Sequence, residues 1–216
     1  MGRDRDVEMK DVDKKSVAYI EKLGSIFGER VDKMTERLRA KSIFGGLKTW
    51  RLLHMMVKTG DNLKQEQFAL QLITQFNYIF KLESVKLLLT PYEVISMGPD
   101  CGVMEMIRDT VTMDGLLKKL KEDHPRIHSI KEFFEAYYVE DLHKVKMRFT
   151  RSLAAYSLVM YFMQVKDRHN GNILLDSQGH IIHLDWGFIF TSSPAGNMNF
   201  EKSPFKLTDE FVDVLN

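Results

Sequence analysis

One stretch constrains this chain more than any other: QVKDRHNGNILLDSQGHIIHLDWGF, residues 164–188. It places acidic, basic, imidazole and amide side chains next to one another. These side chains cannot all face a core, and burying one of them without a partner costs a few kcal/mol, roughly 2–7. Asn-Gly is common turn chemistry, so the segment is either a solvated turn or a functional site.

The sequence after this polar run predicts a hairpin, with strands ILLD and IIHLD joined by SQGH and Gly179 in the turn. Asn172 precedes the first strand and Asp185 ends the second, so both lie at the same end. An amide oxygen beside a carboxylate suits Mg²⁺, with Mn²⁺ as the alternative ion. Asp167 and His169 precede this pair, and either could take a hydroxyl proton. A base followed by two metal-binding groups indicates phosphoryl transfer.

A zinc site is the competing interpretation, because His180 and His183 follow closely. Side chains three apart on a strand point to opposite faces of a sheet, so these two cannot share a metal on a regular strand. We therefore expect both histidines to pack and form hydrogen bonds.

Length and composition limit the class of protein. The 216 residues suit one domain that can have two lobes, and a 44% hydrophobic content supports a real core. With 31 basic and 30 acidic residues, no strong field is expected for nucleic acid or an anionic membrane. Ser152–Val165 is the longest uncharged apolar run, shorter than the ~20 residues of a transmembrane segment. No secretory signal is visible, so we expect a cytoplasmic chain.

The hydrophobic pattern changes along the chain. Apolar residues three and four apart predict an amphipathic helix over 17–38, weakened at Gly24 and Gly28. Strands are expected at RLLHMMVK, YEVISM and VMEMI, and helices dominate after residue 130. This order predicts an α+β fold of two lobes with a cleft between them. The expected parts are a flexible charged tail (1–14), an N-lobe (15–107) and a partial C-lobe (108–216).

The motif Asp-Arg-His-x-x-Asn, followed by a hairpin and His-x-Asp-x-Gly, resembles the catalytic and metal-binding loops of the phosphatidylinositol 3/4-kinase superfamily. Ordinary protein kinases read His-Arg-Asp instead. The resemblance covers residues 30–216 and is loosest over 110–150. The segments ERVDKMTERLRAKSIFGGLKTWRLL, VKTGDNLKQE, GVMEMI and FKLTDEFVDV look most like the type III beta phosphatidylinositol 4-kinases. The resemblance implies a protein-kinase-like fold.

The resemblance also implies roles for individual residues. The catalytic group would be Asp167, Arg168 and His169, with the choice of base between Asp167 and His169 left open. Arg168 could instead pair with a nearby carboxylate. The remaining roles are Mg²⁺ binding by Asn172 and Asp185, ATP binding by Ser42, Gly45, Lys58, Glu66, Glu105, Ile107 and Asn172, and an activation loop containing Ser192, Ser193, Lys202 and Lys206. Within the ATP group, Lys58 would reach the phosphates, Ser42 and Gly45 would form the phosphate loop, and the backbone of Glu105 and Ile107 would face adenine.

Two features depart from the family pattern. Trp186 stands where the family usually has phenylalanine, next to the metal carboxylate. The chain stops at Asn216, whereas the family's helical lobe continues, so we expect this C-lobe to be incomplete.

The function implied by the resemblance is ATP- and Mg²⁺-dependent phosphorylation of phosphatidylinositol at the 4-hydroxyl on a membrane surface. The alternatives are a phosphatidylinositol 3-kinase, or a truncated non-catalytic lobe that binds nucleotide or a partner. Near-zero net charge implies that recruitment to a membrane needs a recruiting or regulatory protein or an exposed apolar element. The resemblance implies a peripheral location on Golgi or other intracellular membranes. An activation loop with few basic residues predicts a preference for unphosphorylated phosphatidylinositol.

Overall fold

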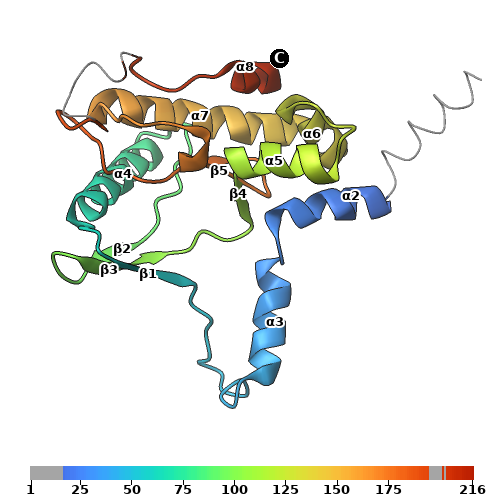
Figure 1. The fold of residues 1–216 in the computed structure, drawn as a ribbon, viewed down its shortest axis with the longest axis horizontal. Coiled ribbons are helices and arrows are strands. Elements are labelled where there is room, and N and C mark those ends of the chain that lie inside the picture. Colours follow the sequence, from blue (N-terminus) through green and yellow to red (C-terminus); the bar gives the residue numbers. More distant parts are fainter. Residues whose placement is uncertain (1–16, 195–200, 202) are drawn as a thin grey trace, which may run out of the picture.

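The computed structural model describes residues 17–194, 201 and 203–216, and Figure 1 shows their arrangement. The predicted tail at 1–14 lies outside the described residues. The first half of the chain contains α2 (Val17–Gly24), η1 (Ser25–Phe27), α3 (Val31–Lys41), β1 (Met55–Thr59), α4 (Lys64–Leu82), β2 (Val94–Ser96) and β3 (Cys101–Glu105). The second half contains β4 (Thr110–Thr112), α5 (Met113–Asp123), α6 (Ile130–Tyr137), α7 (Leu142–Met163), η2 (Asn170–Asn172), β5 (Ile173–Asp176), β6 (Ile181–His183) and α8 (Asp209–Leu215). The predicted α+β fold class is confirmed.

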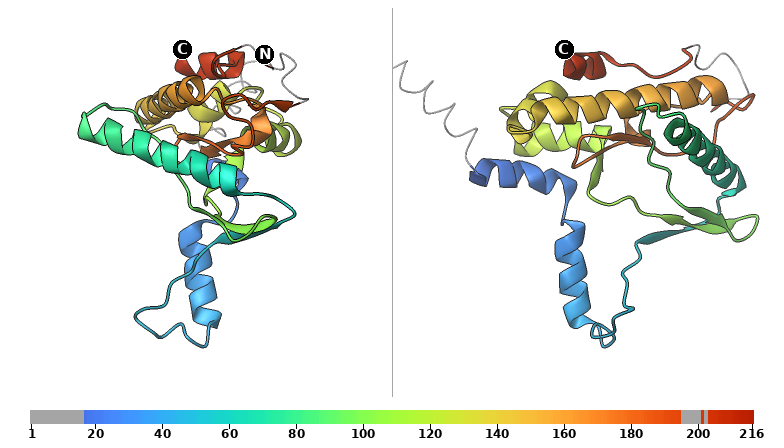
Figure 2. Two further views of the ribbon diagram at one scale, coloured as in Figure 1. Left: turned by 90° about the vertical axis from the view of Figure 1, so that its left-hand side faces the viewer. Right: turned by 180° about the vertical axis from the view of Figure 1, so that it is seen from behind.

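The single helix predicted over 17–38 is wrong, because the chain breaks at Gly28. This glycine has φ +83°, a conformation that is strained for residues with a side chain. Before the break, Phe27 packs against Phe133 and Tyr137 of α6, with ring centroids 6.2 and 5.6 Å apart. After the break, α3 buries no residue and projects away from the body of the molecule (Figures 1 and 2). The segment before the break therefore packs on α6, in the second half of the chain.

The first sheet has the antiparallel order β1-β3-β2, so the strands predicted around Lys58 and MEMI are confirmed. Lys58 pairs with Gly102 in this sheet. A Cβ atom at Gly102 would lie 2.5 Å from the Ile95 carbonyl oxygen and 2.8 Å from Leu63, so the close approach of β2 and α4 requires glycine. This packing sets α4 against the sheet that carries Lys58.

The predicted hairpin is confirmed as β5 and β6, which join β4 in a second antiparallel sheet. β4, α5 and α8 were not predicted. Thr112 ends β4 and caps α5 by accepting a hydrogen bond from the Gly115 amide at 3.0 Å, and Thr208 caps α8 in the same way. The predicted boundary between residues 107 and 108 falls between the two sheets and stays a prediction.

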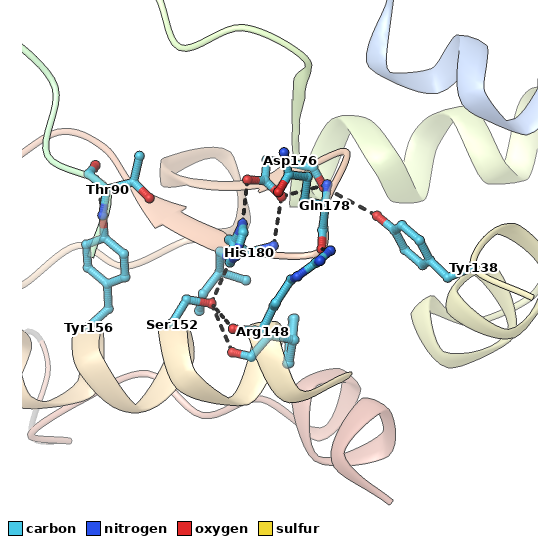
Figure 3. A network of polar contacts seen from close by, with 10 residues as sticks. Thr90, Tyr138, Arg148, Ser152, Tyr156, Asp176, Gln178 and His180 are labelled. Carbon is cyan, nitrogen blue, oxygen red and sulfur yellow. Dashed lines mark hydrogen bonds and ion pairs between the residues drawn. The ribbon is translucent and has the colours of Figure 1, made fainter. Parts of the chain in front are cut away.

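Polar contacts fix the hairpin on α7, as Figure 3 shows. The Ile181 amide donates to the hydroxyl of Ser152 in α7 at 3.0 Å. At the same, turn end of the hairpin, His180 Nδ1 lies 2.8 Å from an Asp176 carboxylate oxygen, which agrees with the hydrogen-bonding role expected for this histidine. The turn end of the hairpin is thereby attached to α7.

The core is formed mainly by the buried face of α7 and the elements around it. Its buried residues include Phe149, Tyr156, Val159, Met160, Phe133, Phe134, Ile181 and Phe211. Among the helices that the structure describes, none has the length and apolar character needed to cross a membrane.

Candidate active site

The catalytic loop predicted at residues 167–172 follows α7 and is closed by its own hydrogen bonds. The Asn172 amide nitrogen, Nδ2, donates to the Asp167 carbonyl at 3.0 Å. The Gly171 amide donates to His169 Nδ1 at 3.1 Å, and the Asn172 backbone amide donates to the His169 carbonyl at 2.9 Å. These contacts hold Asp167, His169 and Asn172 in one tight turn.

The hairpin brings the two predicted metal ligands together. The Leu184 amide donates to the Asn172 carbonyl at 2.9 Å, which places Asp185 beside Asn172. Asp185 has a left-handed backbone (φ +58°), and its Oδ1 accepts a hydrogen bond from the Gly187 amide at 3.2 Å. The open end of the hairpin therefore carries both Asn172 and Asp185, and their roles as metal ligands stay a prediction.

The donor set fits Mg²⁺ rather than a metal held by protein ligands alone. Since Nδ2 of Asn172 is bound to the Asp167 carbonyl, the amide oxygen is the atom left to act as a ligand. Within the part of the chain that the structure describes, no group of three or more His, Cys, Asp or Glu residues could hold a metal ion. Mg²⁺ commonly takes one or two protein oxygens and completes its shell with phosphates and water. The pair of Asn172 and Asp185 therefore fits a Mg²⁺ ion that binds together with nucleotide phosphates.

Arg168, which was predicted to belong to the catalytic group, is buried and binds backbone carbonyls. Its guanidinium donates to three backbone carbonyls, those of Lys166 (3.1 Å), Leu184 (2.6 Å) and Asp185. It is 3% exposed and lies 5.6 Å from the centre of the Trp186 ring. Burial lowers the pKa of Arg168, and the carboxylates of Asp185 and Asp167 oppose this shift. Arg168 thus ties the catalytic loop to the loop that carries Asp185 (residues 184–187, called the metal loop below). It does so by binding carbonyls, whereas the alternative prediction was an ion pair with a carboxylate.

Arg168→Lys is expected to lower the free energy of unfolding by about 2 kcal/mol, because one ammonium group cannot reach three carbonyls in the planar fork geometry of arginine. Chemical denaturation of the two proteins measures this difference. Arg126→Lys, at an exposed position, is the matched control. An equal and small decrease in the free energy of unfolding in both variants would contradict the stabilising role of Arg168.

Lys58, Glu66 and Asp185 share one electrostatic environment. The Glu66 carboxylate on α4 accepts a hydrogen bond from the Tyr92 hydroxyl at 2.7 Å. Burial raises the pKa of Glu66, the charge of Asp185 raises it further, and Lys58 lowers it. Lys58 Nζ lies 4.0 Å from an Asp61 carboxylate oxygen, so its ammonium group is only loosely paired. The strand lysine and the helix glutamate therefore lie near the metal loop.

Gln65 was missed by the sequence analysis. Its side-chain Nε2 donates to the carbonyls of Trp186 (3.2 Å) and Gly187 (2.6 Å). These bonds join α4 directly to the loop that carries Asp185. The only signal in the sequence is the position of Gln65 next to Glu66 on the first turn of the helix.

The structure does not bring the predicted phosphate loop to this site. Ser42 and Gly45 belong to a tight turn at the tip beyond α3, far from α7 in all views (Figures 1 and 2). The Ser42 hydroxyl accepts a hydrogen bond from Trp50 Nε1 at 3.2 Å, and the Gly45 carbonyl accepts one from Arg39 Nε at 2.7 Å. The turn is held by its own side chains and by α3, which explains the difference from the prediction.

The predicted adenine hinge is only partly available. The Glu105 amide donates to the Glu93 carbonyl at 2.8 Å, and the Ile107 carbonyl accepts from the Thr110 hydroxyl at 3.0 Å. Both groups already have partners within the chain. Of the backbone groups predicted to face adenine, the carbonyl of Glu105 and the amide of Ile107 are therefore the ones that could bind it.

The activation loop is described in part. The Ser192 amide donates to the Ile189 carbonyl at 3.0 Å, the Ser193 hydroxyl contacts the Pro194 carbonyl, and Lys206 is half-buried. Lys202 lies outside the described residues. Glu201, which the sequence analysis did not identify, contacts the catalytic loop: its carboxylate accepts a hydrogen bond from the Asp167 amide at 2.9 Å.

Trp186 fits into the core below the metal loop. It is fully buried and stacks on Tyr156, with ring centroids 6.3 Å apart. His183 stacks on the same tyrosine at 4.9 Å, and burial lowers the pKa of His183 well below its usual value. His183 is therefore a neutral packing residue, and the larger tryptophan ring is held between it and Arg168.

Comparisons with known proteins agree with this geometry. Residues 53–216 match the family described as phosphatidylinositol 3- and 4-kinase. The chain is 43% identical over 195 residues to a phosphatidylinositol 4-kinase of Dictyostelium discoideum, covering 88% of this chain and 16% of that protein. It is equally similar to phosphatidylinositol 4-kinase beta 1 of Arabidopsis thaliana (89% and 17%) and to phosphatidylinositol 4-kinase beta of Sorex araneus (43% identity; 83% and 22%).

The chain thus spans between about a sixth and a fifth of the length of these curated relatives. The family match covers most of the chain and includes the hairpin, its polar loops and the strand lysine. The chain belongs to the phosphatidylinositol 3- and 4-kinase family.

Proposed function

We propose that this chain carries the catalytic machinery of an ATP- and Mg²⁺-dependent lipid kinase that phosphorylates phosphatidylinositol at the 4-hydroxyl, giving phosphatidylinositol 4-phosphate. The observation that carries the proposal is the meeting of Asp167, Asn172 and Asp185 at one end of the hairpin, with Lys58 and Glu66 close by. The names of the relatives support the lipid and the 4-position.

In the proposed mechanism, residues of the chain position the reactants and balance the charge that develops during transfer. Asn172 and Asp185 would hold Mg²⁺, which when bound neutralises charge on the phosphates. Lys58 would contact the same phosphates, and Glu66 would orient this part of the site. The adenine would be held by the backbone of Glu105 and Ile107.

Asp167 is the better candidate for the base. His169 Nδ1 already accepts a hydrogen bond from the Gly171 amide, so protonation of this nitrogen would break a contact that closes the loop. The Asp167 backbone is held on the side of the metal ligands by Asn172. A carboxylate there can accept the proton of the inositol hydroxyl as the phosphoryl group is transferred.

The two alternatives are separated by binding and turnover. A non-catalytic lobe would be stabilised by Mg·ATP in a thermal-shift assay but would not consume ATP on phosphatidylinositol vesicles. An enzyme does both. A phosphatidylinositol 3-kinase would also do both, and the position of the phosphate on the product distinguishes it.

The proposal includes a recruiting or regulatory protein and a peripheral location on Golgi or other intracellular membranes. The formal net charge of +1 supports a recruiting protein, because the chain as a whole offers little attraction to anionic lipid. The Golgi location rests on the family resemblance.

Unphosphorylated phosphatidylinositol is expected to be used at least about tenfold better than a bisphosphate, because each added phosphate brings about two negative charges. The described part of the loop from residue 186 to 206 offers Lys206 as a basic residue, and the Glu201 carboxylate faces the catalytic loop. Competition on mixed vesicles measures the preference.

Lysine at Asn197 and Asn199, two loop positions outside the described residues, should reduce this preference. A bisphosphate preferred by the unmodified chain would refute the prediction. An unaltered preference in the lysine variant would show that the loop does not select the headgroup.

A further inference from the structure

Glu201 contacts the catalytic loop at two consecutive residues. Its carboxylate oxygen Oε2 accepts a hydrogen bond from the Asp167 amide at 2.9 Å. Its backbone carbonyl accepts a hydrogen bond from Lys166 Nζ at 2.9 Å. Because Lys166 binds the backbone carbonyl of Glu201 and not its carboxylate, the carboxylate is left to accept the hydrogen bond from the Asp167 amide. The activation loop is therefore attached to the catalytic loop immediately at the proposed base.

The attachment point is a backbone that needs support. Asp167 has φ +62°, a left-handed conformation that costs a residue with a side chain on the order of 1 kcal/mol or more. Its amide is held by Glu201, and its carbonyl is held by the side chain of Asn172 at 3.0 Å. Both polar groups of this residue's backbone are thus fixed, one by the activation loop and one by a proposed metal ligand.

We propose that Glu201 is a positioning residue that couples the activation loop to the catalytic loop and sets the direction of the Asp167 side chain for turnover. This inference rests on the proposed kinase function. The carboxylate acts through the Asp167 amide and does not touch the reacting atoms. Because residue 201 lies in the loop expected to receive the lipid headgroup, a change in that loop reaches Asp167 through one side chain.

The two contacts allow the side chain to be tested alone. Glu201→Ala removes the carboxylate but keeps the carbonyl that binds Lys166, and Glu201→Gln keeps an oxygen that can accept from the Asp167 amide. Glu122→Ala on α5, an exposed position, is the matched control. The full chain is used for each variant.

Turnover of Glu201→Ala is expected to fall about tenfold to a hundredfold, because the direction of the base is lost. The KM for ATP should stay within about twofold, since the nucleotide contacts are unchanged. Glu201→Gln should recover turnover to within about threefold of the unmodified chain, since an amide oxygen is a weaker acceptor than a carboxylate. Turnover of Glu201→Ala equal to that of the Glu122→Ala control would overturn the proposal.

Hydrogen exchange of the Asp167 amide tests the contact without any need for catalysis. We expect exchange in the peptide containing Asp167 to be at least about tenfold faster in Glu201→Ala than in the Glu122→Ala control. Equal exchange would overturn the proposal. Absence of lipid phosphorylation by the unmodified chain would instead refute the proposed function, and the exchange comparison would still decide whether Glu201 holds the loop.

Discussion

Replacing Asp185 by asparagine is expected to lower turnover at least about a thousandfold, which corresponds to ~4 kcal/mol of transition-state stabilisation. The substitution removes the negative charge of a Mg²⁺ ligand. It should leave the fold intact, because Arg168 binds the backbone carbonyl of Asp185 and not its side chain. An asparagine oxygen can also accept the hydrogen bond that the Gly187 amide now donates to Asp185 Oδ1.

The measurement is kcat on phosphatidylinositol vesicles, together with the melting temperature of each protein. Asp213→Asn, at an exposed position on α8, makes the same chemical change away from the site and should keep full activity. Normal turnover in Asp185→Asn would contradict the metal assignment.

Lys58→Ala is expected to lower turnover about a hundredfold or more while weakening ATP binding only a few-fold. The ammonium group should contribute most to the phosphates during transfer, whereas the adenine would be held by backbone groups of the hinge. Little stability should be lost, because the contact of Lys58 with Asp61 is long, at 4.0 Å, and exposed.

Steady-state kinetics and an ATP-binding titration separate these two effects. Lys64→Ala, an exposed position at the start of α4, is the control for loss of a lysine nearby. A Lys58→Ala protein with the turnover of this control would mean that another group contacts the phosphates.

The hairpin and its polar loops could be predicted because their signals are local. Strand alternation, a turn glycine and the spacing from Asn172 to Asp185 are contained in one short segment. The antiparallel pairing of β5 and β6 then determines which residues meet at the open end. Lys58 is similar, since the strand that carries it can be inferred from the residues around it.

The contacts that hold the site together could not be predicted, because they join segments far apart in the sequence. Gln65 reaches Trp186 and Gly187, and Glu201 reaches Asp167. No spacing rule links such positions. The contacts of Arg168 could not be predicted for a related reason: a buried guanidinium can bind carboxylates or carbonyls, and only the folded chain shows three carbonyls around it.

The N-terminal region shows how backbone conformation can override a side-chain pattern. Apolar residues continue at helical spacing through Gly28, yet α2 ends at Gly24, and the positive φ of Gly28 separates the 3₁₀ turn η1 from α3. The turn containing Ser42 and Gly45 follows α3 away from the catalytic loop. The phosphate-loop role predicted for this turn came from the family resemblance alone, and no local signal in the sequence indicates how far α3 carries the turn from the catalytic loop.

The most direct test of the proposed function is the position of the phosphate on the product. The full chain would be incubated with Mg·ATP labelled on the γ-phosphate and vesicles of phosphatidylinositol, and the deacylated product would be separated by chromatography. We expect label on the 4-hydroxyl, and a loss of that label in Asp185→Asn. Label on the 3-hydroxyl, or no transfer to lipid by the unmodified chain, would contradict the proposed function.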